Sequence, residues 1–277
     1  MKSISISDQM LTAYVFVDDY LMSHRAIANW RKSPNCHPAF SDSEVLTIAL
    51  MQGVFGCQTL KQAYLLVASS FRDAFPKLCG YKEWMRRLHE LTAIVGRLIQ
   101  AANRPDGRDL FLVDGKPIPM CKPIRHGRVR LLHEEGAHFG KSTIGWFFGF
   151  KLHALVHISG QIVCAILTPA NWSERDVMLA LAEAMDGGVL LGDRGYRSKD
   201  FEMQLYNDNG ILLVTPQSDP SKYALVSSVR ERVETVFSKL WDRFVDRVFS
   251  RSWNGLWNTI KLKMLHYNLS VAGILPA

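Results

Sequence analysis

Leu110-Phe111-Leu112-Val113-Asp114 is a short apolar run that ends in a carboxylate. Four consecutive apolar residues followed by an acid are typical of a central strand that is buried on both faces of a sheet. The run comes soon after Asn103-Arg104-Pro105-Asp106-Gly107, a turn-forming stretch at which helical periodicity gives way to extended periodicity. We therefore place a domain boundary near residue 106 and expect the first strand of an α/β domain after it.

The composition is that of a basic globular protein. The chain has 277 residues, with 33 Lys and Arg against 26 Asp and Glu, and a formal net charge of +7. Its 48% apolar content is enough for a hydrophobic core, and its 21% charged and 10% aromatic fractions exclude disordered, collagen-like and disulfide-scaffold classes. Five widely spaced cysteines indicate a reducing compartment, and the sequence shows no signal peptide or membrane span. We expect a cytoplasmic protein.

Positive charge is concentrated in two segments of the chain. Residues 115–160 carry seven Lys or Arg against two Glu, and residues 229–263 carry eight Lys or Arg against four acids. The remainder of the chain is therefore slightly negative. These two segments are the expected borders of a site that receives a polyanion such as nucleic acid.

Residues 1–106 show apolar residues at helical spacing and almost no strand-like alternation. The strongest helix start is Ser41, which has the spacing of a capping box with Glu44. Helices are predicted at about 8–22, 41–52, 59–74 and 81–103. We expect a helical N-terminal domain for DNA binding or assembly. Residues 41–65 are the most plausible helix-turn-helix, and a bundle that serves only as a dimerisation surface is the alternative.

Beyond the boundary, strand-like and helical segments alternate. Strands are predicted at 110–113, 146–157, 161–168, 189–191 and 211–214, and helices at 173–185, from residue 198, at 229–244 and at 253–271. This order predicts an α/β domain over residues 107–277, with an antiparallel first hairpin, parallel strands afterwards and a C-terminal helix that packs back. Because segment 115–145 is far longer than the roughly 2–5 residues of a hairpin loop, we predict a functional loop there.

Three acids lie where a carboxylate has little reason to pack. Asp114 follows the first strand, and Asp193 follows the fourth, between glycines that permit sharp turns. Ligands bind beyond the carboxyl ends of strands in such sheets, so the two side chains lie together if these strands are neighbours. Glu234, on the predicted helix 229–244, would complete a carboxylate cluster. Such a set suits two Mg²⁺ or Mn²⁺ ions that promote phosphoryl transfer on a polyanion.

In these residues the chain resembles the DDE transposases of bacterial insertion sequences, which have an RNase H-like catalytic core. The resemblance covers residues 108–245, and it is carried by four motifs in order. These are Leu112-Val113-Asp114 with Pro117-Ile118-Pro119-Met120-Cys121, then Phe150-Lys151-Leu152-His153-Ala154 with Thr168-Pro169-Ala170-Asn171, then Gly192-Asp193-Arg194-Gly195-Tyr196, and last Arg230-x-x-x-Glu234.

The resemblance implies a function and assigns residues to it. It implies an RNase H-like mixed sheet flanked by helices, and a nucleoid-associated bacterial enzyme that cleaves double-stranded DNA at the terminal repeats of its element. The freed 3′-hydroxyls would be joined to target DNA, by a homodimer or higher assembly. Asp114, Asp193 and Glu234 would hold two Mg²⁺ or Mn²⁺ ions. The expected DNA contacts are Lys122, Arg125, Arg128, Arg130, Lys141, Lys151, Arg194, Arg230, Lys239 and Arg243.

The sequence departs from the family pattern near Glu234. The pattern has a Tyr three residues before the Arg and a Lys seven after the Glu, where this chain has Ser227 and Trp241. Lys239 and Arg243 are the nearest basic substitutes for that Lys. Two alternatives to a transposase remain at this point, which are a metal-dependent DNA nuclease on the same core and a catalytically silent DNA-binding protein derived from such an element.

Overall fold

The computed structural model of the chain describes residues 4–28, 38–103, 107, 109–128, 132, 134–142, 145–193, 196, 198–215, 235–236, 238–239, 250 and 252–275. The chain divides into two compact units. Unit 1 comprises Met1–Ala102 together with Asn254–Ala277, and unit 2 comprises Asn103–Trp253. None of the helices in these ranges combines the length and the apolarity that crossing a membrane requires.

Unit 2 is built on one mixed sheet. Its strands are β1 (Leu110–Cys121), β2 (His138–Ser142), β3 (Gly145–His157), β4 (Ile162–Pro169), β5 (Gly188–Leu191) and β6 (Ile211–Val214). The order is β2-β3-β1-β5-β6, and β4 also pairs with β3. β3 is antiparallel to β1, β2 and β4, whereas β5 is parallel to β1 and to β6. The predicted α/β class, the antiparallel hairpin and the later parallel strands are confirmed.

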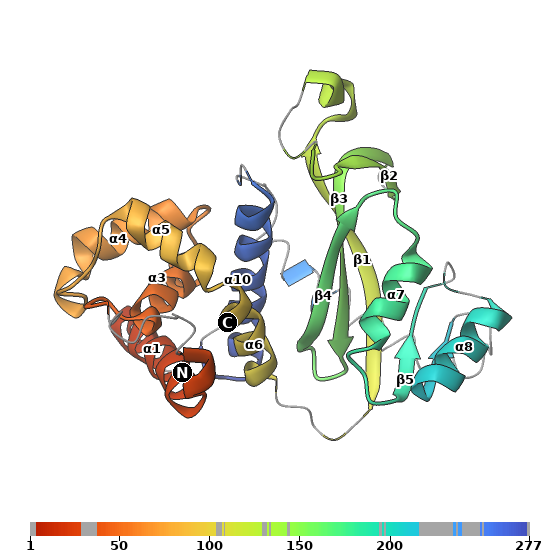
Figure 1. Ribbon diagram of the computed structural model, residues 1–277, viewed down its shortest axis with the longest axis horizontal. Helices are drawn as coiled ribbons and strands as arrows, with labels where there is room; N and C mark the ends of the chain where they lie inside the picture. Colours follow the sequence, from red (N-terminus) through yellow and green to blue (C-terminus); the bar gives the residue numbers. More distant parts are fainter. Residues whose placement is uncertain are drawn as a thin grey trace. The chain divides into compact units, whose positions relative to one another are not determined.

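Two helices cover one face of this sheet (Figure 1). They are α7 (Glu174–Ala182), between β4 and β5, and α8 (Lys199–Asn209), between β5 and β6. Their apolar residues and those of the sheet form one buried cluster, which includes Val113, Leu155, Val177, Met178, Leu181, Leu190, Phe201 and Leu205. The helix predicted at 173–185 is α7, and the side chain of its N-cap residue Ser173 caps no backbone N–H.

The prediction that residues 115–145 form a loop was wrong, because much of this segment is in regular secondary structure. β1 does not end at Asp114 but continues to Cys121 along β3. It is followed by the 3-10 helix η2 (Pro123–Arg128) and by β2. Pro117 and Pro119 lie in this extension, where a missing N–H is tolerated only on an unpaired side of a strand. The Asp109 carbonyl faces β5. Both prolines lie an even number of residues after Asp109, so their backbone groups face that same side of β1. β5 has ended before it reaches them, so no ladder hydrogen bond is lost.

Unit 1 is helical. Its helices are α1 (Ile6–Ser23), α2 (Arg25–Ala28), α3 (Asp42–Val54), α4 (Leu60–Ser70), η1 (Arg72–Ala74), α5 (Tyr81–Glu90), α6 (Thr92–Ala102) and α10 (Trp253–Val271). The helix predicted at 59–74 ends at Ser70. The helix predicted at 81–103 is divided at Leu91, where a fully buried side chain and a turn let α5 and α6 each bury their own apolar stripe.

The C-terminal helix belongs to a different unit from the one that we predicted. We expected it to belong with residues 107–277, but all of α10 beyond Trp253 lies in unit 1. The Asn258 side chain donates to the Leu88 carbonyl at 3.2 Å, and a Cβ on Gly53 would lie 2.5 Å from the His266 ring. α10 is buried over most of its surface, so it acts as a core helix of the helical unit.

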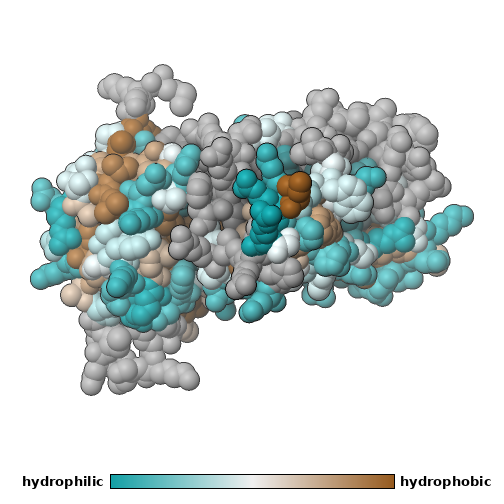
Figure 2. All heavy atoms as spheres, turned by 90° about the horizontal axis from the view of Figure 1, so that it is seen from above, coloured by the Kyte–Doolittle hydropathy of each residue, from teal (hydrophilic) through white to brown (hydrophobic). Residues whose placement is uncertain are grey.

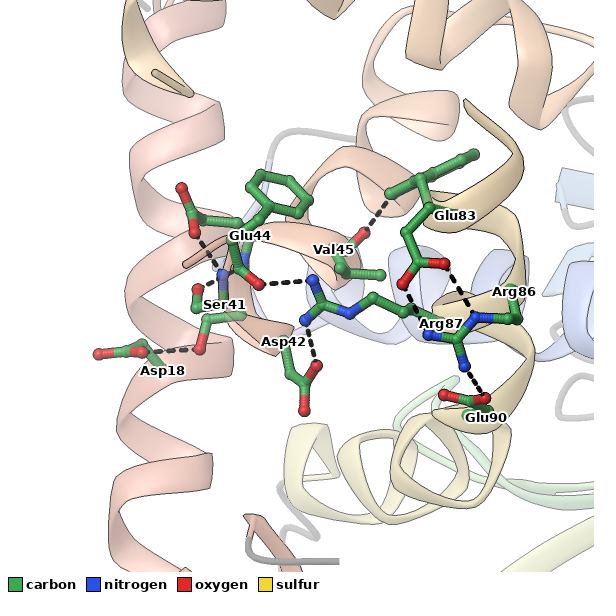
Figure 3. A network of polar contacts seen from close by, with 12 residues as sticks. Asp18, Ser41, Asp42, Glu44, Val45, Glu83, Arg86, Arg87 and Glu90 are labelled. Carbon is green, nitrogen blue, oxygen red and sulfur yellow. Dashed lines mark hydrogen bonds and ion pairs between the residues drawn. The ribbon is translucent and has the colours of Figure 1, made fainter. Parts of the chain in front are cut away.

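A buried arginine ties α5 to the start of α3 (Figure 3). Arg87 donates to the Phe40 carbonyl at 2.5 Å and to the Asp42 carboxylate at 2.6 Å, and its side chain is 4% exposed. The predicted capping box at Ser41 is confirmed, because Ser41 and Glu44 exchange both hydrogen bonds. The neighbouring Arg86 is 57% exposed and pairs with Glu83 and Glu90.

We predict that Arg87→Met destabilises the protein by about 3–5 kcal/mol, because it removes the guanidinium that pairs with the Asp42 carboxylate where little solvent reaches either group. Arg86→Met is the matched control, and it should leave the unfolding midpoint unchanged because its ion pairs are exposed to solvent. Urea unfolding of both variants measures the difference. Equal midpoints for the two variants would contradict a structural role for the Arg87 contacts.

Candidate active site

Two of the predicted acids lie on adjacent strands. Asp114 is within β1, and Asp193 comes two residues after β5. The last parallel pair is Leu112 with Leu191, so the same register continued by two residues sets Asp193 beside Asp114. Asp193 is exposed and Asp114 is half-buried. Both carboxylates therefore lie where β5 ends and the sheet opens, at the carboxyl end of the parallel strands.

Local backbone contacts fix both acids. The Gly115 N–H donates to Asp114 Oδ1 at 2.7 Å. The Gly192 N–H donates to the Val214 carbonyl at 3.1 Å, and the Tyr196 N–H donates to the Asp193 carbonyl at 3.1 Å. The segment that carries Asp193 is thus joined to β6 before the acid and turns back directly after it.

Tyr196 is a buried neighbour of this site. Its side chain is 1% exposed, and burial raises the pKa of its phenol above the ordinary value. The carboxylates of Glu174, Asp114 and Asp193 raise that pKa further, in this order of influence. The phenol is therefore protonated at neutral pH, and three negative charges surround it. The sequence pattern gave Tyr196 only as part of a motif, and Glu174 only as one residue of the helix predicted at 173–185.

Lys151 and Glu174 form an ion pair beside the two aspartates. Their side chains are 15% and 37% exposed, respectively. A Cβ on Gly115 would lie 3.0 Å from Lys151 Cε, so the lysine stem packs over the backbone next to Asp114. We predicted Lys151 as a DNA contact, and its partner in the protein itself is Glu174. The pair links β3 to the first turn of α7.

His153 is buried on the same face of β3 as Lys151. It is 1% exposed, and its Nε2 lies 3.2 Å from Thr168 Oγ1. Burial, with a smaller contribution from Lys151, lowers the pKa of His153 from 6.5 to about 4. The ring is therefore neutral at physiological pH. His157 is also buried, and its Nδ1 accepts from the Ser159 N–H at 3.1 Å.

The structure describes some of the other predicted site residues and not the rest. Lys122, Arg125, Arg128, Lys141 and Lys239 are exposed. Glu234, Arg230, Arg130, Arg194 and Arg243 lie outside the described residues, although Thr235 and Val236, directly after Glu234, are helical. Among the described residues there is no group of three His, Cys, Asp or Glu that could hold a metal ion. The third carboxylate of the cluster thus remains a prediction.

Comparison with known proteins gives one match. A family model described as a transposase DDE domain matches residues 105–247, which is more than half of the chain and spans all three acids. None of the curated proteins matches the chain.

The low pKa of His153 predicts a specific pH dependence of stability. Below pH 6.5 the unfolded chain binds a proton at His153 that the folded protein binds only near pH 4. The free energy of unfolding therefore falls by up to about 3 kcal/mol as the pH drops from 6.5 to 4. His153→Gln should remove this part of the slope, and His138→Gln, at an exposed site, should retain it. Urea unfolding at several pH values between 7 and 4 measures the slopes, and an unchanged slope in His153→Gln would contradict the assignment.

Proposed function

The chain belongs to the family of transposases with a DDE domain, and from this premise we propose that it cuts and joins DNA. It would cleave the strands at the ends of an insertion element and join the freed 3′-hydroxyls to target DNA, at the bacterial nucleoid. The observation that supports the proposal is the β1–β5 register, which, continued by two residues beyond Leu112–Leu191, would bring Asp193 beside Asp114 at the carboxyl end of the parallel strands.

The chemistry of these side chains fits divalent metal ions. Carboxylate oxygens are hard ligands that suit Mg²⁺ or Mn²⁺, and adjacent carboxylates repel one another unless a cation lies between them. We propose that Asp114, Asp193 and Glu234 hold two such ions. When bound there, the ions would activate a water or a 3′-hydroxyl and stabilise the departing oxygen.

The protein's own residues would prepare DNA for this step. Exposed Lys and Arg on η2 and β2 would neutralise phosphates, and Lys239 extends this charge to the helix after Glu234. The Lys151–Glu174 pair and the buried Tyr196 would hold the strand ends that carry the two aspartates. The mixed sheet with α7 and α8 on one face supports the assignment of unit 2 to an RNase H-like core.

We propose that unit 1 serves assembly on DNA. The candidate helix-turn-helix corresponds to α3 and α4, which are separated by residues 55–59. α4 has one basic residue, Lys61, and exposes Leu65 and Leu66, which are 52% and 41% accessible. An exposed apolar face favours a protein partner over DNA phosphates, so this face supports a homodimer or a larger assembly.

Metal binding tests the acid cluster directly. We predict that wild-type protein binds Mg²⁺ in calorimetry and gains thermal stability from it, and that Asp193→Asn loses both effects because one ligand carries no charge. Asp208→Asn, at an exposed position at the end of α8, should behave as wild type. Undiminished Mg²⁺ binding in Asp193→Asn would remove this residue from the proposed site, whereas absence of binding in wild type would favour the catalytically silent alternative.

Strand transfer tests the reaction. With labelled element ends, target DNA and Mg²⁺, we expect joined products from wild type and from Asp208→Ala. Ala variants of Asp114, Asp193 and Glu234 should lose activity by on the order of 10³-fold or more, because each would remove several kcal/mol of transition-state stabilisation. Cleavage without joining in wild type would identify a nuclease. Joined products from Asp193→Ala at the wild-type rate would refute the proposal.

A further inference from the structure

The face of β1 that packs under α7 is closed directly beside Asp114. Val113 belongs to the buried cluster that includes residues of α7. A Cβ on Gly115 would lie 3.0 Å from Lys151 Cε and 3.0 Å from His153 Nδ1, so side chains of β3 cover the backbone at this point. Val113 and Gly115 therefore face α7, and that face is filled by the protein itself.

Both aspartates belong to the other face of the sheet. Successive side chains of a strand point to opposite faces, so Asp114 points away from α7. A Cβ on Gly192 would lie 3.3 Å from Met178 Cε of α7, which places Gly192 on the α7 face. The alternation of β5, continued by one residue, sets Asp193 on the face opposite α7. The reaction proposed for the two acids thus takes place on that face.

Lys116 is the next residue of β1 on the face of Asp114. It pairs with Leu152 of β3, which is 0% exposed, so β3 closes one side of it. On its other side β5 has already ended, since the last β1–β5 pair is Leu112–Leu191. Lys116 is half-buried. Its open side is therefore the side on which the chain turns at Asp193.

A lysine at this position brings a positive charge to the acids. Two residues of a strand span about 7 Å, and an ammonium on a flexible four-carbon stem can move over that distance. Lys151, by contrast, faces α7 and is paired with Glu174. Lys122 lies six residues further along the chain, which is about 20 Å for an extended strand. Lys116 is thus placed to act at the acids, whereas Lys122 lies at the distance of a flanking phosphate.

The described surface of unit 2 is suited to a polyanion, but its acids are not. Figure 2 shows hydrophilic side chains over much of this surface, whereas hydrophobic side chains are more frequent on the helical unit. A phosphate that approaches Asp114 and Asp193 is repelled by their carboxylates, because like charges repel. A cation on the same face of β1 reduces this repulsion at the place where the strand is to be cut.

We propose that Lys116 binds the phosphate at which the DNA strand is cut, and that it is a catalytic residue of unit 2. Its ammonium donates to a non-bridging oxygen of this phosphate and stabilises the negative charge that gathers there in the transition state. The contact is a charge-assisted hydrogen bond, so Lys116 takes no part in the bonds that form and break. This inference rests on the proposed function, and it adds a residue that was not among the predicted DNA contacts.

A structural role for Lys116 is the alternative, and the two roles differ in sign. If Lys116 served only to hold Asp114 in place, its removal would weaken metal binding and the reaction together. If it serves the phosphate, its removal strengthens metal binding, because its charge repels the divalent ion that the acids hold. The reaction still slows. Mg²⁺ affinity and reaction rate therefore distinguish the two roles.

The test compares Lys116→Gln with wild type on the full chain. In calorimetry, Lys116→Gln should bind Mg²⁺ about 3- to 10-fold more tightly, because a unit charge about 7 Å from a divalent ion is removed. In cleavage of labelled element ends at saturating Mg²⁺, the same variant should be slower by on the order of 10²-fold, as when one hydrogen-bond donor to the transition state is lost. Lys116→Arg, which keeps the charge, should return both values most of the way to wild type.

Lys199→Gln is the matched control. Lys199 is exposed at the first residue of α8, which covers the other face of the sheet. The same loss of charge there should leave Mg²⁺ affinity and cleavage rate unchanged. Thermal unfolding checks that each variant is folded.

Three results would overturn the inference. Equal Mg²⁺ affinity in Lys116→Gln and wild type would place the lysine away from the acids. Weaker Mg²⁺ binding together with a slower reaction would show the structural role. An unchanged rate at saturating Mg²⁺ would remove Lys116 from catalysis.

Failure of the proposed function has a different signature, because it is seen in wild type. If wild type binds Mg²⁺ but cuts no DNA, the proposed function fails, and the calorimetry still decides whether Lys116 lies at the acids. If wild type binds no Mg²⁺, both the proposed function and this inference are overturned.

Discussion

The unequal pairing of β1 on its two sides is the constraint on which unit 2 depends. On one side β1 pairs with β3 over almost its whole length, and on the other it pairs with β5 over only Leu110–Leu112. The early end of β5 opens the sheet beside Asp114 and lets the chain turn at Asp193. At the other end of β5, its first residue Gly188 permits the close approach to β1, because its φ is +101° and a Cβ there would lie 2.5 Å from the Asp109 carbonyl oxygen.

The same asymmetry explains the charge pattern around the site. A strand that continues without a parallel neighbour has an open side, and Pro117 and Pro119 prevent another strand from adding there. The other neighbour of β1 is β3, which carries Lys151. The charge of Lys151 is balanced by Glu174 in the first turn of α7. Lys151 is therefore paired within the protein. Arg125 and Arg128 of η2 and Lys141 of β2 are exposed to solvent, where a partner can reach them.

Much of this arrangement could be predicted from sequence, and the parts that could not have physical causes. The apolar run at 110–113, the capping box at Ser41 and the order of strands are local signals, and they predicted the α/β class correctly. The length of β1 was missed because two prolines and a glycine follow Asp114, and an unpaired strand side that tolerates them is a tertiary feature. The C-terminal helix was assigned to the wrong unit because an apolar helix does not encode which core it enters. Glu174 was missed as a neighbour of Asp114 because only the packing of α7 brings it there, and Tyr196 was missed because the turn after Asp193 brings it back.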